Sequence, residues 1–302
     1  MLDHRIAHGL ATDSIRELSE TGFISGGFRE VYQQKLMSGG VAQTVKGARR
    51  KCDEFFPILN RSCLLVHQGE DKKLGPHLVG LSLEGFHGAL LGRDIPPGAE
   101  FLSMVRYRFT FMHSAFKYSE IGAVGLFTRH AVARNHQRNG QKDKQQLASD
   151  LLSTLTSIFV MSYARLSHPS IQQVYARAGG GLYVGLPAET PFGTVLCFKT
   201  FLNIENLQPK YRAAVAGLAN LDIDRFTERA FRSLVLREDV NVTDEEKAQI
   251  AAMIEAPELK WMHSPYEDKR DVSTDHAGEE HQPDGDLEEA CDDSEGNAAP
   301  RF

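Results

Sequence analysis

The sequence predicts an α+β protein in which a mainly antiparallel sheet packs with helices and an acidic C-terminal tail is disordered. Short apolar runs, several of them alternating, are separated by glycine and proline, which is typical of antiparallel strands. The segment 144–166 instead carries apolar residues at helical spacing. Beyond Ser264 the chain is acidic and poor in apolar residues, so it cannot bury enough surface to offset the entropy of ordering.

We expect three regions along the chain. Residues 1–98 form an N-terminal α/β region, and it stays open whether they are a separate domain or part of the next one. Residues 99–263 form an α+β core that holds the candidate site, and residues 264–302 are the disordered tail. The tail carries thirteen Asp and Glu against three Lys and Arg, so its charge of −10 leaves about +4 on the rest of a chain whose net charge is −6.

In the first region the residues 1–28 show no regular pattern, and glycine-flanked apolar segments follow. Pro57 is expected to end a helix over 41–56, because proline lacks the amide hydrogen that a helix interior needs. The expected elements are helices over 28–37 and 41–56, strands over 62–67 and 77–83, and a turn-rich stretch over 85–92.

The segment 101–113 is the clearest strand, because its residues alternate with a period of two. Tyr107 and Phe109 fall on one face, and Arg106 and Arg108 fall on the other. A second strand is expected over 118–127.

The remaining elements follow from spacing and from helix and turn signals. We expect a helix over 144–166 that Pro169 ends, a hairpin at Gly179-Gly180, and a central strand that is apolar on both faces. Thr243 and Glu246 form a capping box at the start of the last helix. The expected ranges are strands over 171–178, 181–186 and 192–202, and helices over 209–218, 224–236 and 245–255.

Composition narrows the class of protein. Of the 302 residues 41% are hydrophobic and 25% are charged, which is ordinary for a soluble globular chain. The four cysteines show no CxxC spacing, so we expect neither a zinc site nor a disulfide framework. The N-terminus has no secretory pattern, and no run reaches the ~18 apolar residues of a membrane span. We therefore expect a cytoplasmic protein with no membrane contact, no metal and no cofactor.

Two histidines and three arginines lie within ten residues, from Arg129 to Arg138. On a helix, His130, Arg134 and Arg138 are four residues apart and share one face. An imidazole beside guanidinium groups can exchange protons and bind phosphate, as cleavage of a phosphodiester requires. The same pattern also fits a basic helix that faces solvent, and both interpretations stay open.

The string His130-Ala131-x-x-Arg134-x-x-x-Arg138-x-Gly140 resembles the signature of small toxin-type ribonucleases, the barnase–EndoU–colicin–RelE-like group. The resemblance covers about a dozen residues and a looser pattern of later strands. It implies metal-independent RNA cleavage by a helix that precedes a twisted antiparallel sheet. By the resemblance, His130 is the acid or base, Arg134 and Arg138 hold phosphate, and Lys199 or Thr200 lines the sheet side. This chain departs from the group in its length and in the strands that precede the motif.

The surrounding charge points the same way. Between Glu100 and Gln146 eight Lys and Arg face three Asp and Glu, a net charge of +5, which suits RNA or another polyanion. The candidate nucleic-acid-binding residues are Arg106, Arg108, Lys117, Arg129, Lys142 and Lys144.

Three alternatives remain. Arg129-x6-His136 resembles the R-x(4–6)-H motif of the helical HEPN ribonucleases, although the strands do not suit an all-helical domain. A second alternative is a non-enzymatic accessory factor that binds nucleic acid or protein through its basic face and is modulated by the acidic tail. The third is a structural or assembly protein. An inhibitor or regulatory protein is a further expected partner.

Overall fold

The computed structural model describes residues 2–21, 42–72, 75–87, 99–111, 117–140, 144–190, 193–221 and 223–265. Residues 1–266 form one compact unit, so the regions 1–98 and 99–263 fold together. The helix expected over 28–37 and almost all of the acidic tail lie outside the described residues.

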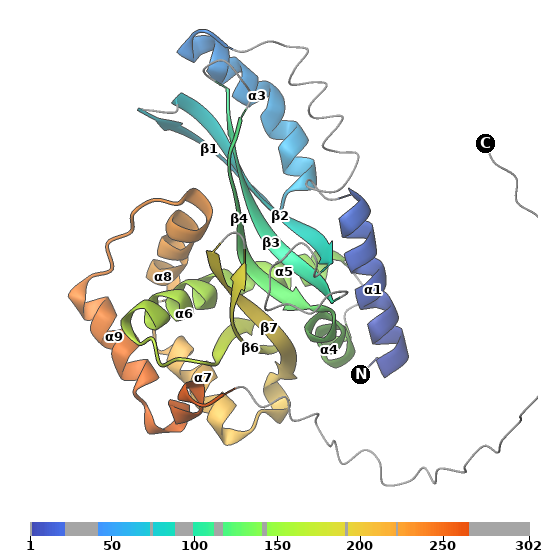
Figure 1. Cartoon of the computed structure of the whole chain (residues 1–302), viewed down its shortest axis with the longest axis vertical. Helices are drawn as coiled ribbons and strands as arrows, with labels where there is room; N and C mark the ends of the chain where they lie inside the picture. Colours follow the sequence, from blue (N-terminus) through green and yellow to red (C-terminus); the bar gives the residue numbers. More distant parts are fainter. Residues whose placement is uncertain are drawn as a thin grey trace, which may run out of the picture. The chain divides into compact units, whose positions relative to one another are not determined.

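A seven-stranded sheet forms the centre of the protein, in the order β1-β2-β3-β4-β7-β6-β5 (Figure 1). All neighbours are antiparallel except β4 and β7, which are parallel. The predicted α+β class with a mainly antiparallel sheet is therefore confirmed. The strands are β1 (Leu65–Asp71), β2 (Gly75–His87), β3 (Glu100–Thr110), β4 (Lys117–Thr128), β5 (Val174–Ala178), β6 (Gly181–Thr190) and β7 (Gly193–Asn203).

The parallel junction joins two antiparallel halves of the sheet, β1–β4 and β5–β7. Its register pairs Leu126 with Cys197 and Phe127 with Phe198. Strand β7 lies inside the sheet, as its two apolar faces predicted, and it carries a bulge. Because Val184 on β6 pairs with Thr200 and the next residue pairs with Phe198, Lys199 is the extra residue.

Helices cover both faces of the sheet (Figure 1). Helix α3 packs on one face against β1 and β2, and α1, α4 and α6 pack on the other. The helices are α1 (His4–Thr21), α3 (Val45–Ser62), α4 (Arg129–Asn139), α5 (Lys144–Ser153), α6 (Leu155–Ser167), α7 (Pro209–Ala219), α8 (Ile223–Ala230) and α9 (Asp244–Ile254), with the short segments η2 (Ile204–Asn206), η3 (Phe231–Leu236) and η4 (Pro257–His263).

Strand β3 shows how alternation divides the core. Tyr107 and Phe109 pack in the cluster beneath α3, while Leu102 and Met104 pack in the larger cluster on the other face. The predicted separation of the arginines from the aromatic rings is thus confirmed. Arg106 reaches η3 on the side of the larger cluster, where its Nη1 donates to the carbonyl of Leu234 at 3.1 Å.

Helix α3 does not end at Pro57, as its sequence suggested, but continues to Ser62. The reason is packing beyond the proline, because Leu59 is fully buried in the same cluster as Cys52 and Phe55. Burying one leucine contributes roughly 1.5–3 kcal/mol, comparable with the ~3 kcal/mol that a proline costs inside a helix.

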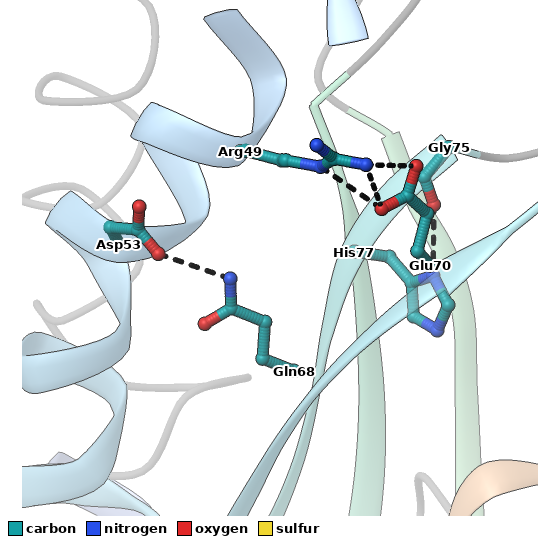
Figure 2. Close-up of polar contacts among 6 residues, drawn as sticks. All are labelled: Arg49, Asp53, Gln68, Glu70, Gly75 and His77. Atoms are coloured by element: carbon teal, nitrogen blue, oxygen red, sulfur yellow. Dashed lines mark hydrogen bonds and ion pairs between the residues drawn. The ribbon is translucent and has the colours of Figure 1, made fainter. Parts of the chain in front are cut away.

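Polar contacts also fix α3 on the sheet, and Figure 2 shows them. The Arg49 guanidinium donates to both carboxylate oxygens of Glu70 on β1, at 2.7 to 3.0 Å. Asp53 accepts from the Gln68 amide at 3.1 Å. Both ends of the Arg49–Glu70 pair are about half exposed, so water screens it and we assign it less than ~1 kcal/mol.

Two further expectations were incomplete. Residues 4–21 form α1, although the sequence there shows no regular pattern. The helix expected over 144–166 is divided into two at the buried Thr154, whose amide and hydroxyl both donate to the carbonyl of Leu151, at 3.1 and 2.6 Å. By length and composition alone the segment Gln145–Ser167 could cross a membrane, but 56% of its apolar window is buried inside the protein, as in a core helix.

Candidate active site at helix α4

Helix α4 begins where β4 ends, and Thr128 makes the connection. Its hydroxyl accepts from the amide of Ala131 at 3.1 Å, which caps the helix. The same hydroxyl donates to the carbonyl of Lys199 at 3.1 Å. The start of α4 is therefore held against the bulge in β7.

One side of α4 is buried and the other carries the basic residues. Ala131, Val132 and Ala133 pack into the larger core cluster, while Arg129 and His130 are exposed. Arg134 lies one turn after His130 and is half-buried. The small alanines let the helix lie close to the sheet, so the basic face has a rigid support.

Helix α1 runs antiparallel to α4 along this basic face. The amide of Leu2 donates to the carbonyl of Gln137 at 2.9 Å, near the end of α4. Near the start of α4, the ring of His8 lies 5.9 Å from the ring of His130, measured between centroids. His4 lies 4.3 Å from His8 in the same measure. Three imidazoles from two helices therefore gather at one place.

Burial and charge set the protonation state of His8. Its pKa is lowered first by burial, and then by electrostatic interaction with His4, Arg129 and Arg134. His8 is consequently a neutral imidazole at pH 7. A neutral imidazole accepts a proton, so His8 has the state that a general base needs.

The three arginines of α4 differ in what they contact. Nη1 of Arg134 donates to the side chain of Gln137 at 2.9 Å, on the same helix. Arg129 forms an ion pair with Glu100 at 2.9 Å. Nη1 of Arg138 donates to the backbone carbonyl of Phe201 on β7 at 2.5 Å. The structure thus places Arg134 with His130 and turns Arg138 towards the sheet.

The sheet-side candidates lie near α4 through their backbone. The carbonyl of Lys199 contacts Thr128. The charge of the Lys199 ammonium acts on Cys197, whose thiol belongs to the cluster on the α3 side of the sheet. Thr200 is half-buried and pairs with Val184. None of the described contacts brings the Lys199 or Thr200 side chain to His130.

Two of the candidate nucleic-acid-binding residues, Arg106 and Arg108, contact η3 and not α4. Arg106 is only 5% exposed, and both it and Arg108 donate to carbonyls of η3, those of Leu234 and Leu236. Lys117 begins β4 and Lys144 begins α5, and their side chains are outside the described set. Lys142 lies outside the described residues.

A buried polar group lies behind α4 and fixes its position. The Asn135 amide donates to the hydroxyl of Tyr183 at 2.7 Å and to the carboxylate of Asp150 at 2.9 Å. Asn139 donates to the same carboxylate at 3.3 Å. Burial raises the pKa of Tyr183 well above its ordinary value, so its hydroxyl stays protonated. These contacts join α4, α5 and β6 into one rigid unit.

His8 is the residue that the sequence did not assign to the site. The sequence does place His4 and His8 one helical turn apart. It does not indicate that they lie beside α4, which is more than a hundred residues further along the chain. The described residues contain no group of three His, Cys, Asp or Glu that could hold a metal ion. The pair Arg129 and His136 is divided, because His136 is only 2% exposed while Arg129 lies on the surface with Glu100.

Comparison with protein-family models, with curated proteins and with solved structures gives no match.

Proposed function

We propose that this chain is a metal-independent RNA endonuclease of the toxin type, with its reaction centre where α1 meets α4. The observation that carries the proposal is the approach of His8 to within 5.9 Å of His130 between ring centroids. Cleavage of RNA at its own 2′-hydroxyl needs one base and one acid on opposite sides of the phosphate. Two imidazoles from separate helices are suited to those two tasks.

The lowered pKa of His8 assigns the role of the base to His8, and we assign the role of the acid to His130. His8, neutral at pH 7 because burial and neighbouring positive charges lower its pKa, takes the proton from the 2′-hydroxyl. The 2′-oxygen bonds to phosphorus, and the bond from phosphorus to the 5′-oxygen breaks. Protonated His130 gives its proton to that leaving oxygen. The products are a 2′,3′-cyclic phosphate and a 5′-hydroxyl.

Arg134 is assigned to the phosphate. Its guanidinium lies on the same face of α4 as His130, and its charge already acts on His8. A guanidinium binds phosphate oxygens through two parallel hydrogen bonds and stabilises the negative charge of the transition state. Arg138, which holds the carbonyl of Phe201, acts as a positioning residue for the end of α4.

The order of elements supports the same proposal. Helices α4, α5 and α6 come before the antiparallel strands β5, β6 and β7, and α4 packs on β7. A helix followed by a twisted antiparallel sheet is what the resemblance to toxin-type ribonucleases implies. We propose RNA as the substrate and the cytoplasm as the compartment, with an inhibitor protein as a further partner.

The test is cleavage of a fluorescent single-stranded RNA by the purified full chain in the presence of EDTA. We expect His8→Ala and His130→Ala each to lower the rate by roughly 10²-fold or more, and Arg134→Ala to lower it also. Arg50→Ala, on the exposed side of α3, and His263→Gln, on η4, are the matched controls and should cleave like the wild type. A substrate with a 2′-deoxy sugar at the cleaved position should remain intact.

The rate should also rise with pH as His8 loses its proton. Because the pKa of His8 lies below 6.5, the rising limb of kcat/KM must fall below pH 6.5 and disappear in His8→Ala. If the wild type leaves RNA intact but binds it, and Arg134→Ala weakens that binding in a salt-dependent way, the chain is the accessory factor instead.

A further inference from the structure

Strands β4 and β7 touch over only a short stretch. Their register contains Leu126 with Cys197 and Phe127 with Phe198, and earlier along both strands it contains no pair of described residues. A cavity of about 150 Å³ opens where the strands part, between the sheet, α6 and η3. It is lined by Arg106, Gly122, Ala123, Val124, Ser162, Thr194, Val195, Leu196, Ser233, Leu234 and Arg237.

Arg106 brings a buried positive charge to this cavity. It is only 5% exposed, and its Nη1 donates to the carbonyl of Leu234 at 3.1 Å. Gly122 makes room for it, since a Cβ there would lie 2.8 Å from Nη2 of Arg106. A guanidinium cannot lose its proton in a protein, so the charge at this wall is permanent.

Arg237, an exposed residue that follows η3, also lines the cavity, and its backbone conformation is strained. Its φ of 55° places it in the left-handed region, and within the described residues it is the one non-glycine with a positive φ. Glycine or asparagine normally occupies such a position at a helix end. Strain of this kind is concentrated at ligand-binding and catalytic positions, where the surroundings hold it in place.

We propose that this cavity binds a small oxyanion, of the phosphate or carboxylate class. Its lining includes Arg106 and Arg237 together with Ser162 and Ser233, and no lining residue carries a carboxylate. One carboxylate reaches the lining, because Glu189 accepts from the hydroxyl of Thr194 at 2.5 Å. Since one water position needs roughly 10–15 Å³, the volume accommodates an ion of a few heavy atoms with bound water.

The oxyanion site is separate from the site on α4. Gly122 lies six residues before Thr128 on β4, which corresponds to roughly 20 Å at ~3.3 Å per residue. The proposal goes beyond the proposed ribonuclease and does not depend on it. An anion bound here would tie both halves of the sheet to η3.

The test uses the full chain in a buffer without phosphate, with inorganic phosphate or acetate as the probe and chloride at matched ionic strength as the reference. We expect phosphate, acetate or both to raise the melting temperature by roughly 3 °C or more at saturation, with a dissociation constant from calorimetry. Phosphate alone would place the ligand in the phosphate class, and acetate alone in the carboxylate class.

Two variants change the cavity without removing the buried Arg106. Arg237→Gly removes one guanidinium and relieves the strain, so it should weaken binding by about tenfold or more while the protein without anion melts at a higher temperature. Ser162→Leu fills the space and should weaken binding by a similar factor. Arg232→Ala, on the same segment η3 but paired with Glu238 at the surface, should bind like the wild type.

Either of two results would overturn the proposal. Phosphate and acetate could both stabilise the protein no more than chloride does. Alternatively, Arg237→Gly and Ser162→Leu could fold and keep the affinity of the wild type.

Discussion

The hydroxyl of Thr128 donates to the carbonyl of Lys199 at 3.1 Å and accepts from the amide of Ala131 at the same distance. One side chain thereby ends β4, starts α4 and holds the bulge of β7. Lys199 is the extra residue of that bulge, and it follows Phe198, which pairs with Phe127 in the parallel register.

Replacing Thr128 with alanine should lower the free energy of unfolding by about 1–2 kcal/mol, because the variant loses both the helix cap and the contact with β7. The measurement is urea denaturation followed by circular dichroism. Thr128→Ser keeps the hydroxyl and is the matched control. An equal loss in both variants would mean that the methyl group, rather than the hydroxyl, matters.

The hydroxyl of Tyr183 should matter more than that of Tyr175. Tyr183→Phe removes the acceptor that the buried Asn135 amide uses at 2.7 Å, and we expect a loss of about 1–3 kcal/mol. Tyr175 is equally buried, but within the described residues its hydroxyl bonds only to the sulfur of Met253 at 3.7 Å, so Tyr175→Phe should cost less. Equal losses in urea denaturation would contradict the role given to Asn135.

Glu246 should make the stability of the protein depend on acidic pH. Burial alone would raise its pKa, but hydrogen bonds from Thr243 and the charges of Arg229 and Arg225 lower it below 4.5. The ionised carboxylate therefore stabilises the fold in full above about pH 4.5, and this contribution is lost as pH falls through the lowered pKa.

Glu246→Gln should consequently cost about 2 kcal/mol or more at pH 7, and the difference from the wild type should shrink on acidification. The measurement is the unfolding free energy at pH 7 and at pH 3 to 4. Glu245→Gln, the exposed neighbour in the first turn of α9, is the control and should show no such difference. A gap that stays constant with pH would refute the assignment.

Pro57→Ala should stabilise the protein. Pro57 is exposed inside α3, so its side chain adds little packing while its ring prevents a helical hydrogen bond. We expect a gain of about 2 kcal/mol, since the ~3 kcal/mol cost of the proline is partly offset by its restriction of the unfolded chain. The thermal midpoint measures the effect, and a lower midpoint would contradict it.

Local patterns predicted the elements whose residues alternate or repeat regularly. The period of two predicted strand β3, in which Arg106 and Tyr107 lie on different faces of the sheet. The capping box of Thr243 and Glu246 forms as expected. The continuation of α3 beyond Pro57 was not predicted, because it depends on the burial of Leu59 in the finished fold. A local stop signal is outweighed there by tertiary packing.

The candidate site illustrates the same limit. The face shared by His130 and Arg134 follows from helical spacing alone. The approach of His8 does not, because nothing local indicates that α1 lies along α4. The sequence also does not predict that Arg138 turns towards the sheet. Its partner is the backbone carbonyl of Phe201, and every residue has a carbonyl, so no residue type indicates this contact.

The junction of β4 with β7 joins parts of the chain that lie far apart, for Thr128 and Lys199 are separated by 71 residues. The antiparallel pairs within each half close shorter loops, and the entropy lost on closure grows with loop length. Such distant contacts slow folding, so we expect the two halves to form before they join. Until then β4 and β7 are both open edges, and an open edge pairs readily with another copy of the chain. We therefore expect aggregation to compete with the joining of the two halves, whose connection contains α4, α5 and α6.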